Sequence, residues 1–60
     1  MAIENKKKVA LVTGGGSGIG KSICLRLGLK QYKVLVIDLS LDTAQQTAQQ
    51  IMSNGGQAET

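Results

Sequence analysis

Short apolar runs and helix-like apolar spacings alternate along this chain. Residues 9–12 and 34–37 are apolar at every position, and polar residues or glycine follow each run. A strand that is apolar on both faces is typical of a parallel sheet with layers above and below it. Both runs are therefore predicted to be buried parallel strands.

The segment between the two runs has the pattern of an amphipathic helix. Ile19, Ile23 and Leu27 recur at four-residue spacing, whereas Lys21 and Arg26 fall on other faces. This spacing predicts a helix of about three turns with one apolar stripe.

A second helix is predicted after the second strand. Ser40 is suited to cap its N-terminus, and residues 54–56, Asn-Gly-Gly, supply a stop. The apolar positions of this helix keep helical spacing and are Leu41, Ala44, Ala48, Ile51 and Met52. Residues 57–60 are then predicted to begin a third strand.

The order β-α-β-α-β predicts an α/β fold, the N-terminal part of a Rossmann-type, doubly wound parallel sheet. Two successive right-handed crossovers place both helices on one face and leave the other face bare. A chain of this size buries only about 60% of its unfolded surface. We therefore expect residues 9–60 to be the N-terminal portion of a single domain in a longer chain. Residues 1–8 are polar, lack periodicity and are predicted to be a flexible lead-in.

Composition excludes several kinds of chemistry. The chain has no His and one Cys, so neither a metal site nor a Ser-His or Cys-His catalytic pair is expected. Cys24 is interpreted as a small buried hydrophobe. The net charge of +3 includes the run Lys6-Lys7-Lys8, which is interpreted as a solvated leader rather than a nucleic-acid site. Apolar runs of four residues predict no membrane span and no signal peptide, so a cytoplasmic protein is expected.

The candidate chemistry lies in a glycine-rich loop between the first strand and the first helix. Residues 13–20 read Thr-Gly-Gly-Gly-Ser-Gly-Ile-Gly. Glycines expose main-chain N–H groups, and the start of a helix favours a phosphate. This loop is therefore predicted to bind a phosphate group.

Three phosphate-binding patterns compete for this loop. The common dinucleotide fingerprint G-x-G-x-x-G is not met. The P-loop pattern G-x-x-x-x-G-K-[ST] is met in full, and its residues are Gly15, Gly20, Lys21 and Ser22. The pattern T-G-x-x-x-G-x-G is also met, by Thr13, Gly14, Gly18 and Gly20.

The third pattern resembles the short-chain dehydrogenases/reductases. The resemblance extends from residues 9–14 through the first helix and residues 34–38 to the Gly55-Gly56 turn. It implies that the motif glycines, Gly14, Gly18 and Gly20, shape the turn around a pyrophosphate. It also implies that main-chain N–H groups near Ser17 and Ile19 contact the cofactor.

Asp38 favours this resemblance over the P-loop. It ends the second strand 18 residues after Gly20, close to the spacing of about 20 at which an acid meets the adenosine ribose. A carboxylate accepts hydrogen bonds from ribose hydroxyls and repels a 2′-phosphate. In this family the phosphate-reading members carry a basic residue at the positions of Ser17 or Leu39, and both are neutral here. The cofactor is therefore predicted to be NAD(H), bound by Gly14, Ser17, Gly18, Ile19, Gly20, Asp38 and Leu39.

The resemblance also implies groups that these residues lack. Family members reduce or oxidise a substrate with a Tyr-x-x-x-Lys pair well downstream, and position four after Tyr32 is Val36. No catalytic residue is assigned within the chain. The family's glycine near Gln31 is also missing, while Gly28 falls inside the predicted helix.

The resemblance implies an NAD-dependent oxidoreductase acting on a secondary alcohol or ketone, and a homo-oligomer. This segment then supplies only the dinucleotide site. A P-loop nucleoside triphosphatase or kinase and a non-catalytic dinucleotide-binding module stay open as alternatives.

Replacing Asp38 with arginine tests its predicted role. In the complete enzyme, Asp38→Arg is expected to move cofactor preference from NAD toward NADP, because the guanidinium replaces repulsion of the 2′-phosphate with attraction. The ratio of kcat/KM for the two cofactors measures the change. An unmoved ratio contradicts the assignment.

Overall fold

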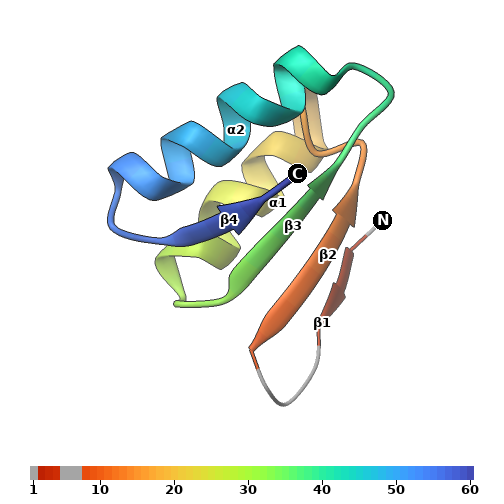
Figure 1. The fold of residues 1–60 in the computed structure, drawn as a ribbon. Helices are drawn as coiled ribbons and strands as arrows, with labels where there is room; N and C mark the ends of the chain where they lie inside the picture. Colours follow the sequence, from red (N-terminus) through yellow and green to blue (C-terminus); the bar gives the residue numbers. More distant parts are fainter. Residues whose placement is uncertain (1, 5–7) are drawn as a thin grey trace.

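The computed structural model describes residues 2–4 and 8–60, which form a four-stranded sheet and two helices (Figure 1). In chain order the elements are β1 (Ala2–Glu4), β2 (Val9–Thr13), α1 (Gly18–Leu29), β3 (Lys33–Ile37), α2 (Leu41–Ser53) and β4 (Gln57–Glu59). The predicted order β-α-β-α-β is confirmed from β2 to β4.

The sheet has the order β1-β2-β3-β4, in which β2, β3 and β4 run parallel. Register pairs Val12 with Val36 and Thr13 with Ile37, so β2 and β3 end side by side. The third strand that residues 57–60 were expected to begin is β4. From β2 to β4 the sheet therefore has the parallel arrangement that the two apolar runs predicted.

The structure differs from the predicted flexible lead-in at Ala2–Glu4, which form a strand. This segment is β1, which pairs antiparallel with β2 in a register that sets Ile3 opposite Leu11. The outer edge of β2 offers main-chain N–H and C=O groups that can pair with any extended segment. Such pairing needs no apolar period, which is why the pattern gave no sign of it. Residues 1 and 5–7 of the predicted lead-in lie outside the described residues.

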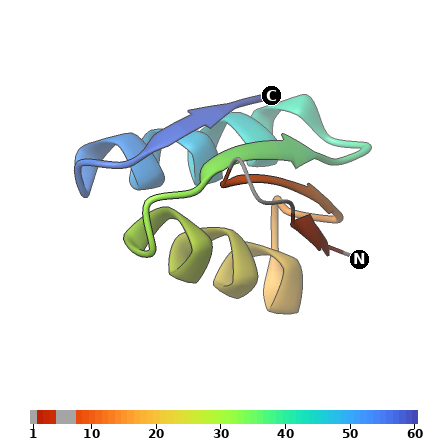
Figure 2. The same cartoon turned by 90° about the horizontal axis from the view of Figure 1, so that it is seen from below.

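Both helices lie on the same face of the sheet, as the two crossovers predicted (Figures 1 and 2). Along β2 and β3, buried residues alternate with half-buried ones. The core consists of the side chains between the helices and this face, namely Ala10, Val12, Cys24, Leu27, Val34, Val36, Ala44, Ala48 and Ile51. On the other face, Leu11 and Leu35 stay half-buried and Ile37 is exposed. The strands are thus apolar on both faces, but one face lacks a helical layer in the described part of the chain.

The buried face of α1 differs from the predicted stripe. Ile19 is 81% exposed, and the buried positions are Cys24, Leu27 and Gly28. Ile23 packs against the core only in part. Small side chains let α1 lie close to the sheet, so the helix is rotated from the orientation that its largest residues indicated.

Gly28 explains how the two helices approach each other. A Cβ built on Gly28 lies 2.8 Å from Cγ2 of Ile51, and a Cβ on Gly56 lies at the same distance from that methyl group. Ile51 is 1% exposed and therefore fills a notch that these two glycines leave open. A mid-helix glycine costs roughly 1 kcal/mol against alanine. Here the close packing of α1 and α2 offsets that cost, and α1 continues past Gly28 to Leu29.

The end of α1 is a Schellman turn closed by a residue other than glycine. The Tyr32 N–H donates to the Leu27 carbonyl at 3.0 Å, and the Gln31 N–H donates to the Gly28 carbonyl at 3.1 Å. Gln31 has φ +70°, in the left-handed region that glycine normally occupies at this position. Gln31 therefore stands where relatives of this type were expected to carry glycine.

The end of α2 has the same turn with glycine in that place. The Gly56 N–H donates to the Ile51 carbonyl at 2.9 Å, and the Gly55 N–H donates to the Met52 carbonyl at 3.0 Å. Gly55 has φ +87°, and a Cβ there would meet no atom within 4 Å. The predicted stop at residues 54–56 is confirmed.

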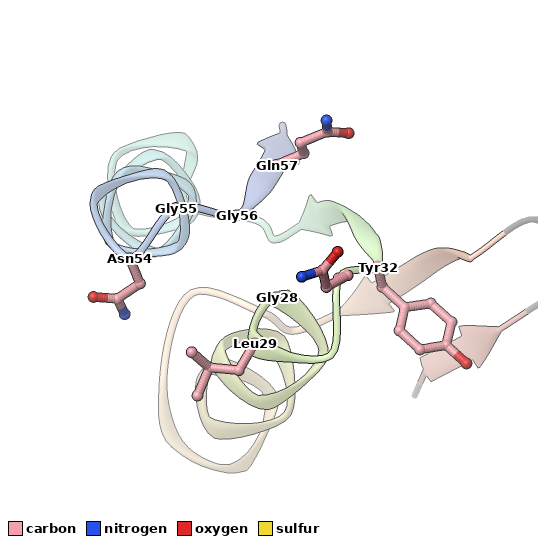
Figure 3. Close-up of a pocket in the computed structure, with 8 residues that line it drawn as sticks. Gly28, Leu29, Tyr32, Asn54, Gly55, Gly56 and Gln57 are labelled. Carbon is pink, nitrogen blue, oxygen red and sulfur yellow. The ribbon is translucent and has the colours of Figure 1, made fainter.

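The two turns line a hollow of about 210 Å³ (Figure 3). Leu29 and Asn54 come to it from the ends of α1 and α2, respectively. Its lining contributes no carboxylate, amine or thiol. We therefore assign no chemistry to this hollow.

Exchanging the residues at the two turns tests their conformational cost. Gln31→Gly is expected to raise the free energy of unfolding of the complete protein by about 1 kcal/mol, because an L-residue is strained at positive φ. Gly55→Gln is the matched reverse change and should lower the free energy of unfolding by a similar amount. Urea denaturation measures both, and equal effects of the same sign contradict the explanation.

Candidate functional site

The two loops that carry the predicted site residues lie at the same end of the sheet. The glycine loop follows β2, and residues 38–40 follow β3 (Figure 1). Because β2 and β3 are parallel and in register, their carboxyl ends place the two loops side by side. Open α/β sheets bind ligands at this edge.

Two features of the glycine loop require glycine. Gly14 has φ +69° and Gly18 has φ +59°, which L-residues rarely adopt, and open space surrounds both positions. Gly20 has a different reason, because a Cβ there would overlap the carbonyl oxygen of Gly14. The loop therefore folds directly onto the first turn of α1.

The underside of the loop rests on the core. A Cβ on Gly15 would lie 2.8 Å from Cγ1 of Val36 and 2.9 Å from Sγ of Cys24. Cys24 is fully buried, and burial raises the pKa of its thiol. The interpretation of Cys24 as a small buried hydrophobe is confirmed.

The N-terminus of α1 leaves its hydrogen-bond donors open. Ser17 occupies the N-cap position with extended backbone, but its side chain does not cap the helix, and the first turn has no acidic residue. Within the part of the chain that the structure describes, the main-chain N–H groups of residues 17–20 have no acceptor. These donors and the helix dipole together favour an anion at this position.

The N-terminus of α2 has a side-chain cap. The Ser40 hydroxyl accepts a hydrogen bond from the Thr43 N–H at 3.4 Å, and Asp42 lies in the first turn. The cap predicted at Ser40 is confirmed. Unlike the start of α1, the start of α2 thus has a side-chain cap and an acidic residue in its first turn.

Asp38 faces the glycine loop from the end of β3. Its Oδ2 accepts a hydrogen bond from the Gly16 N–H at 2.9 Å, and its Oδ1 accepts one from the Ser40 N–H at 3.1 Å. The main-chain N–H groups of Ser40 and Gly16 lower the pKa of the Asp38 carboxyl. The side chain is therefore ionised at neutral pH, and each oxygen keeps a lone pair for a further donor.

The structure brings the predicted residues together at one edge. Gly14, Ser17, Gly18, Ile19 and Gly20 form the loop and the first turn of α1, and Asp38 lies across from them. Leu39 is fully exposed, as an apolar residue next to Asp38.

Two residues of this edge, Gly16 and Thr43, were not predicted from the sequence to be part of the site. Gly16 is an unspecified position of the motif, yet a Cβ there would overlap the Thr43 hydroxyl and lie 3.0 Å from Oδ2 of Asp38. Gly16 thus fits into a notch on the first turn of α2. No signal in the sequence links Gly16 with Thr43, because only the register of β2 and β3 brings them together.

The loop geometry does not suit the P-loop alternative. In a P-loop, the main-chain N–H groups of the glycine-rich loop cradle phosphates. Here the Gly15 N–H donates to the Ile37 carbonyl at 3.1 Å, and the Gly16 N–H donates to Asp38. Two of the loop's donors therefore bind the end of β3.

Comparison with known proteins shows the family. The family model described as short chain dehydrogenase matches residues 8–60. The chain belongs to the short-chain dehydrogenase/reductase family, as the glycine motif indicated.

Individual relatives are dehydrogenases of several kinds. The chain is 45% identical to cyclohexanol dehydrogenase of Acinetobacter sp. strain SE19 over 58 residues, which are 97% of this chain and 23% of that protein. It is 39% identical to 7alpha-hydroxysteroid dehydrogenase of Escherichia coli K12 over 51 residues, 85% of this chain and 20% of that protein. The chain thus spans about a fifth of the length of these relatives.

A solved structure has the same fold. A protein of Haemophilus influenza assigned as a D-mannonate oxidoreductase, with bound NAD, superposes with a TM-score of 0.84 at 23% identity. The match covers 93% of this chain and 20% of that one. The Rossmann-type arrangement predicted for residues 9–60 is confirmed.

Neither α1 nor α2 is long and apolar enough to cross a membrane. In residues 2–4 and 8–60, no group of three His, Cys, Asp or Glu side chains could hold a metal ion.

A pair of alanine substitutions in the first turn of α1 tests the geometry of the loop. Gly20→Ala is expected to weaken NAD binding to the complete protein at least tenfold, because its methyl group must displace the carbonyl of Gly14. Ser22→Ala is the matched control, since Ser22 is exposed in the same turn, and it should leave NAD affinity unchanged. Isothermal titration calorimetry measures both. A large loss from Ser22→Ala contradicts the account, because it is the result expected if Ser22 bound the magnesium of a nucleotide.

Proposed function

We propose that the full-length protein is an NAD(H)-dependent oxidoreductase that interconverts a secondary alcohol and a ketone. Residues 9–60 supply its dinucleotide-binding site as the N-terminal portion of a single Rossmann domain. Membership of a dehydrogenase family and the NAD bound to the structural relative support this function. One observation carries it, namely the open N-terminus of α1 lying opposite the Asp38 carboxylate.

The open N-terminus of α1 binds the pyrophosphate. The N–H groups of residues 17–20 are available as donors, and the glycines at positions 14 and 18 leave open space beside them. An N–H donor without a protein acceptor can bind the pyrophosphate in exchange for water, with no hydrogen bond inside the protein to break. The absence of a side-chain cap at Ser17 is therefore an asset for this function.

Asp38 holds the adenosine ribose. Its ionised carboxylate accepts hydrogen bonds from the 2′- and 3′-hydroxyls and repels a 2′-phosphate. Neither Ser17 nor Leu39 supplies a cation to offset that repulsion. This charge distribution selects NAD(H) over NADP(H).

Two exposed apolar side chains flank these polar groups. Leu39 adjoins Asp38 and contacts the adenine side of the cofactor, whereas Ile19 lies in the first turn of α1, beside the pyrophosphate. Burying them under a bound dinucleotide removes apolar surface from water, which favours binding.

NAD supplies the nicotinamide ring that accepts or gives the hydride. The groups that hold the substrate and move its proton belong to the remainder of the full-length protein, because the described chain spans about a fifth of its relatives' length. The same remainder covers the bare face of the sheet over Leu11, Leu35 and Ile37. A homo-oligomeric, cytoplasmic enzyme completes the proposal.

Direct titration of the full-length protein tests this function. NAD is expected to bind with a Kd in the range of about 1 µM to 1 mM, typical of enzyme ligands. NADP should bind at least tenfold more weakly, because Asp38 repels its 2′-phosphate. ATP with magnesium is the comparison ligand for the P-loop alternative. Binding of ATP with magnesium and none of NAD overturns the proposal, and NAD binding without turnover of any secondary alcohol leaves a binding module instead of an enzyme.

A further inference from the structure

We propose that Asp38 is also a positioning residue, which holds the glycine loop in its binding shape. This inference rests on the proposed function, in that the ligand of the loop is a dinucleotide. Ribose recognition alone requires only that the carboxylate be present at the end of β3. Holding the loop requires that it bind the loop before any ligand arrives.

The contacts of Asp38 join two separate loops. Its Oδ2 accepts from the N–H of Gly16, 22 residues earlier in the chain, and its Oδ1 accepts from the N–H of Ser40. One carboxylate thus connects the loop after β2 with the start of α2. Hydrogen bonds from N–H groups to a charged acceptor are about twice as strong as neutral ones.

The space around Gly16 strengthens this connection. A Cβ at Gly16 would overlap the Thr43 hydroxyl, so the loop lies directly against the first turn of α2. Thr43 is itself held, because its hydroxyl donates to the Ser40 carbonyl at 3.1 Å. The Gly16 peptide therefore packs against the first turn of α2, and its N–H group is held there by the hydrogen bond to Asp38.

The position of Gly16 explains how its contact with Asp38 orders the main-chain donors of the binding site. Ser17, the first of the four free donors, follows Gly16 directly, and the Gly15 N–H is tied to the Ile37 carbonyl. Fixing the main chain of a glycine-rich loop costs more conformational entropy than fixing other residues. Because Asp38 orders the loop before the ligand binds, ligand binding itself loses less conformational entropy.

Holding the loop does not conflict with binding the ribose. Each carboxylate oxygen has one main-chain donor and can accept a second hydrogen bond. Removing the carboxylate should therefore weaken binding even of a dinucleotide whose adenosine ribose has no hydroxyls for Asp38 to recognise.

A cycle of protein and ligand changes separates the two roles. Wild type and Asp38→Ala, both as full-length protein, are titrated with NAD and with an NAD analogue whose adenosine ribose lacks the 2′- and 3′-hydroxyls. If Asp38 holds the loop, Asp38→Ala should weaken binding of the analogue at least fivefold. Asp38→Asn keeps an acceptor oxygen for the Gly16 N–H and should recover part of that loss. The matched control is Asp42→Ala, which also removes one carboxylate, from the first turn of α2. It should leave the affinity for the analogue unchanged.

A second readout needs no ligand. Hydrogen exchange of the Gly16 amide in the free protein should be at least tenfold faster in Asp38→Ala than in wild type or Asp42→Ala. Equal affinity of wild type and Asp38→Ala for the analogue overturns the proposal, and so does an unchanged exchange rate at Gly16. If wild type binds no NAD at all, the proposed function fails, while the exchange rates still decide whether Asp38 holds the loop.

Discussion

The structure depends on one constraint, which is that the main chain after β2 must turn tightly onto the start of α1. A Cβ at Gly20 would overlap the Gly14 carbonyl, and Gly15 rests on Val36 and Cys24 with no room for a side chain. The turn leaves the first N–H groups of α1 without acceptors and directs them to the edge of the sheet. The binding chemistry that we propose for this edge is therefore a consequence of backbone packing, since no side chain caps the helix.

The rest of the fold serves to hold that turn in place. The parallel register of β2 and β3 brings Asp38 across from Gly16, and Ile51 in its glycine notch fixes how α2 lies on α1. Small residues make both contacts possible. The chain uses glycine for three different physical reasons, which are positive φ at Gly14, close main-chain approach at Gly20 and helix packing at Gly28.

Much of the fold could be predicted from the sequence because it depends on local sequence patterns. The strands, the Ser40 cap and the stop at Gly55 depend on residues close together in the chain. The family followed from the spacing of the motif glycines. What the pattern missed depends on tertiary contacts or on main-chain pairing, as in the exposed Ile19 and in β1, which pairs along the edge of β2. The fit of Gly16 against Thr43 and the left-handed conformation of Gln31 likewise appear only once the elements are packed.

The central claim is that the free donors at the start of α1 bind the diphosphate of a nicotinamide dinucleotide. A crystal structure of the full-length protein with NAD tests it most directly. The account predicts diphosphate oxygens within about 2.7–3.2 Å of main-chain nitrogens among residues 17–20, with the ribose hydroxyls on Asp38. A diphosphate bound elsewhere, with those N–H groups facing solvent or another part of the protein, contradicts the account.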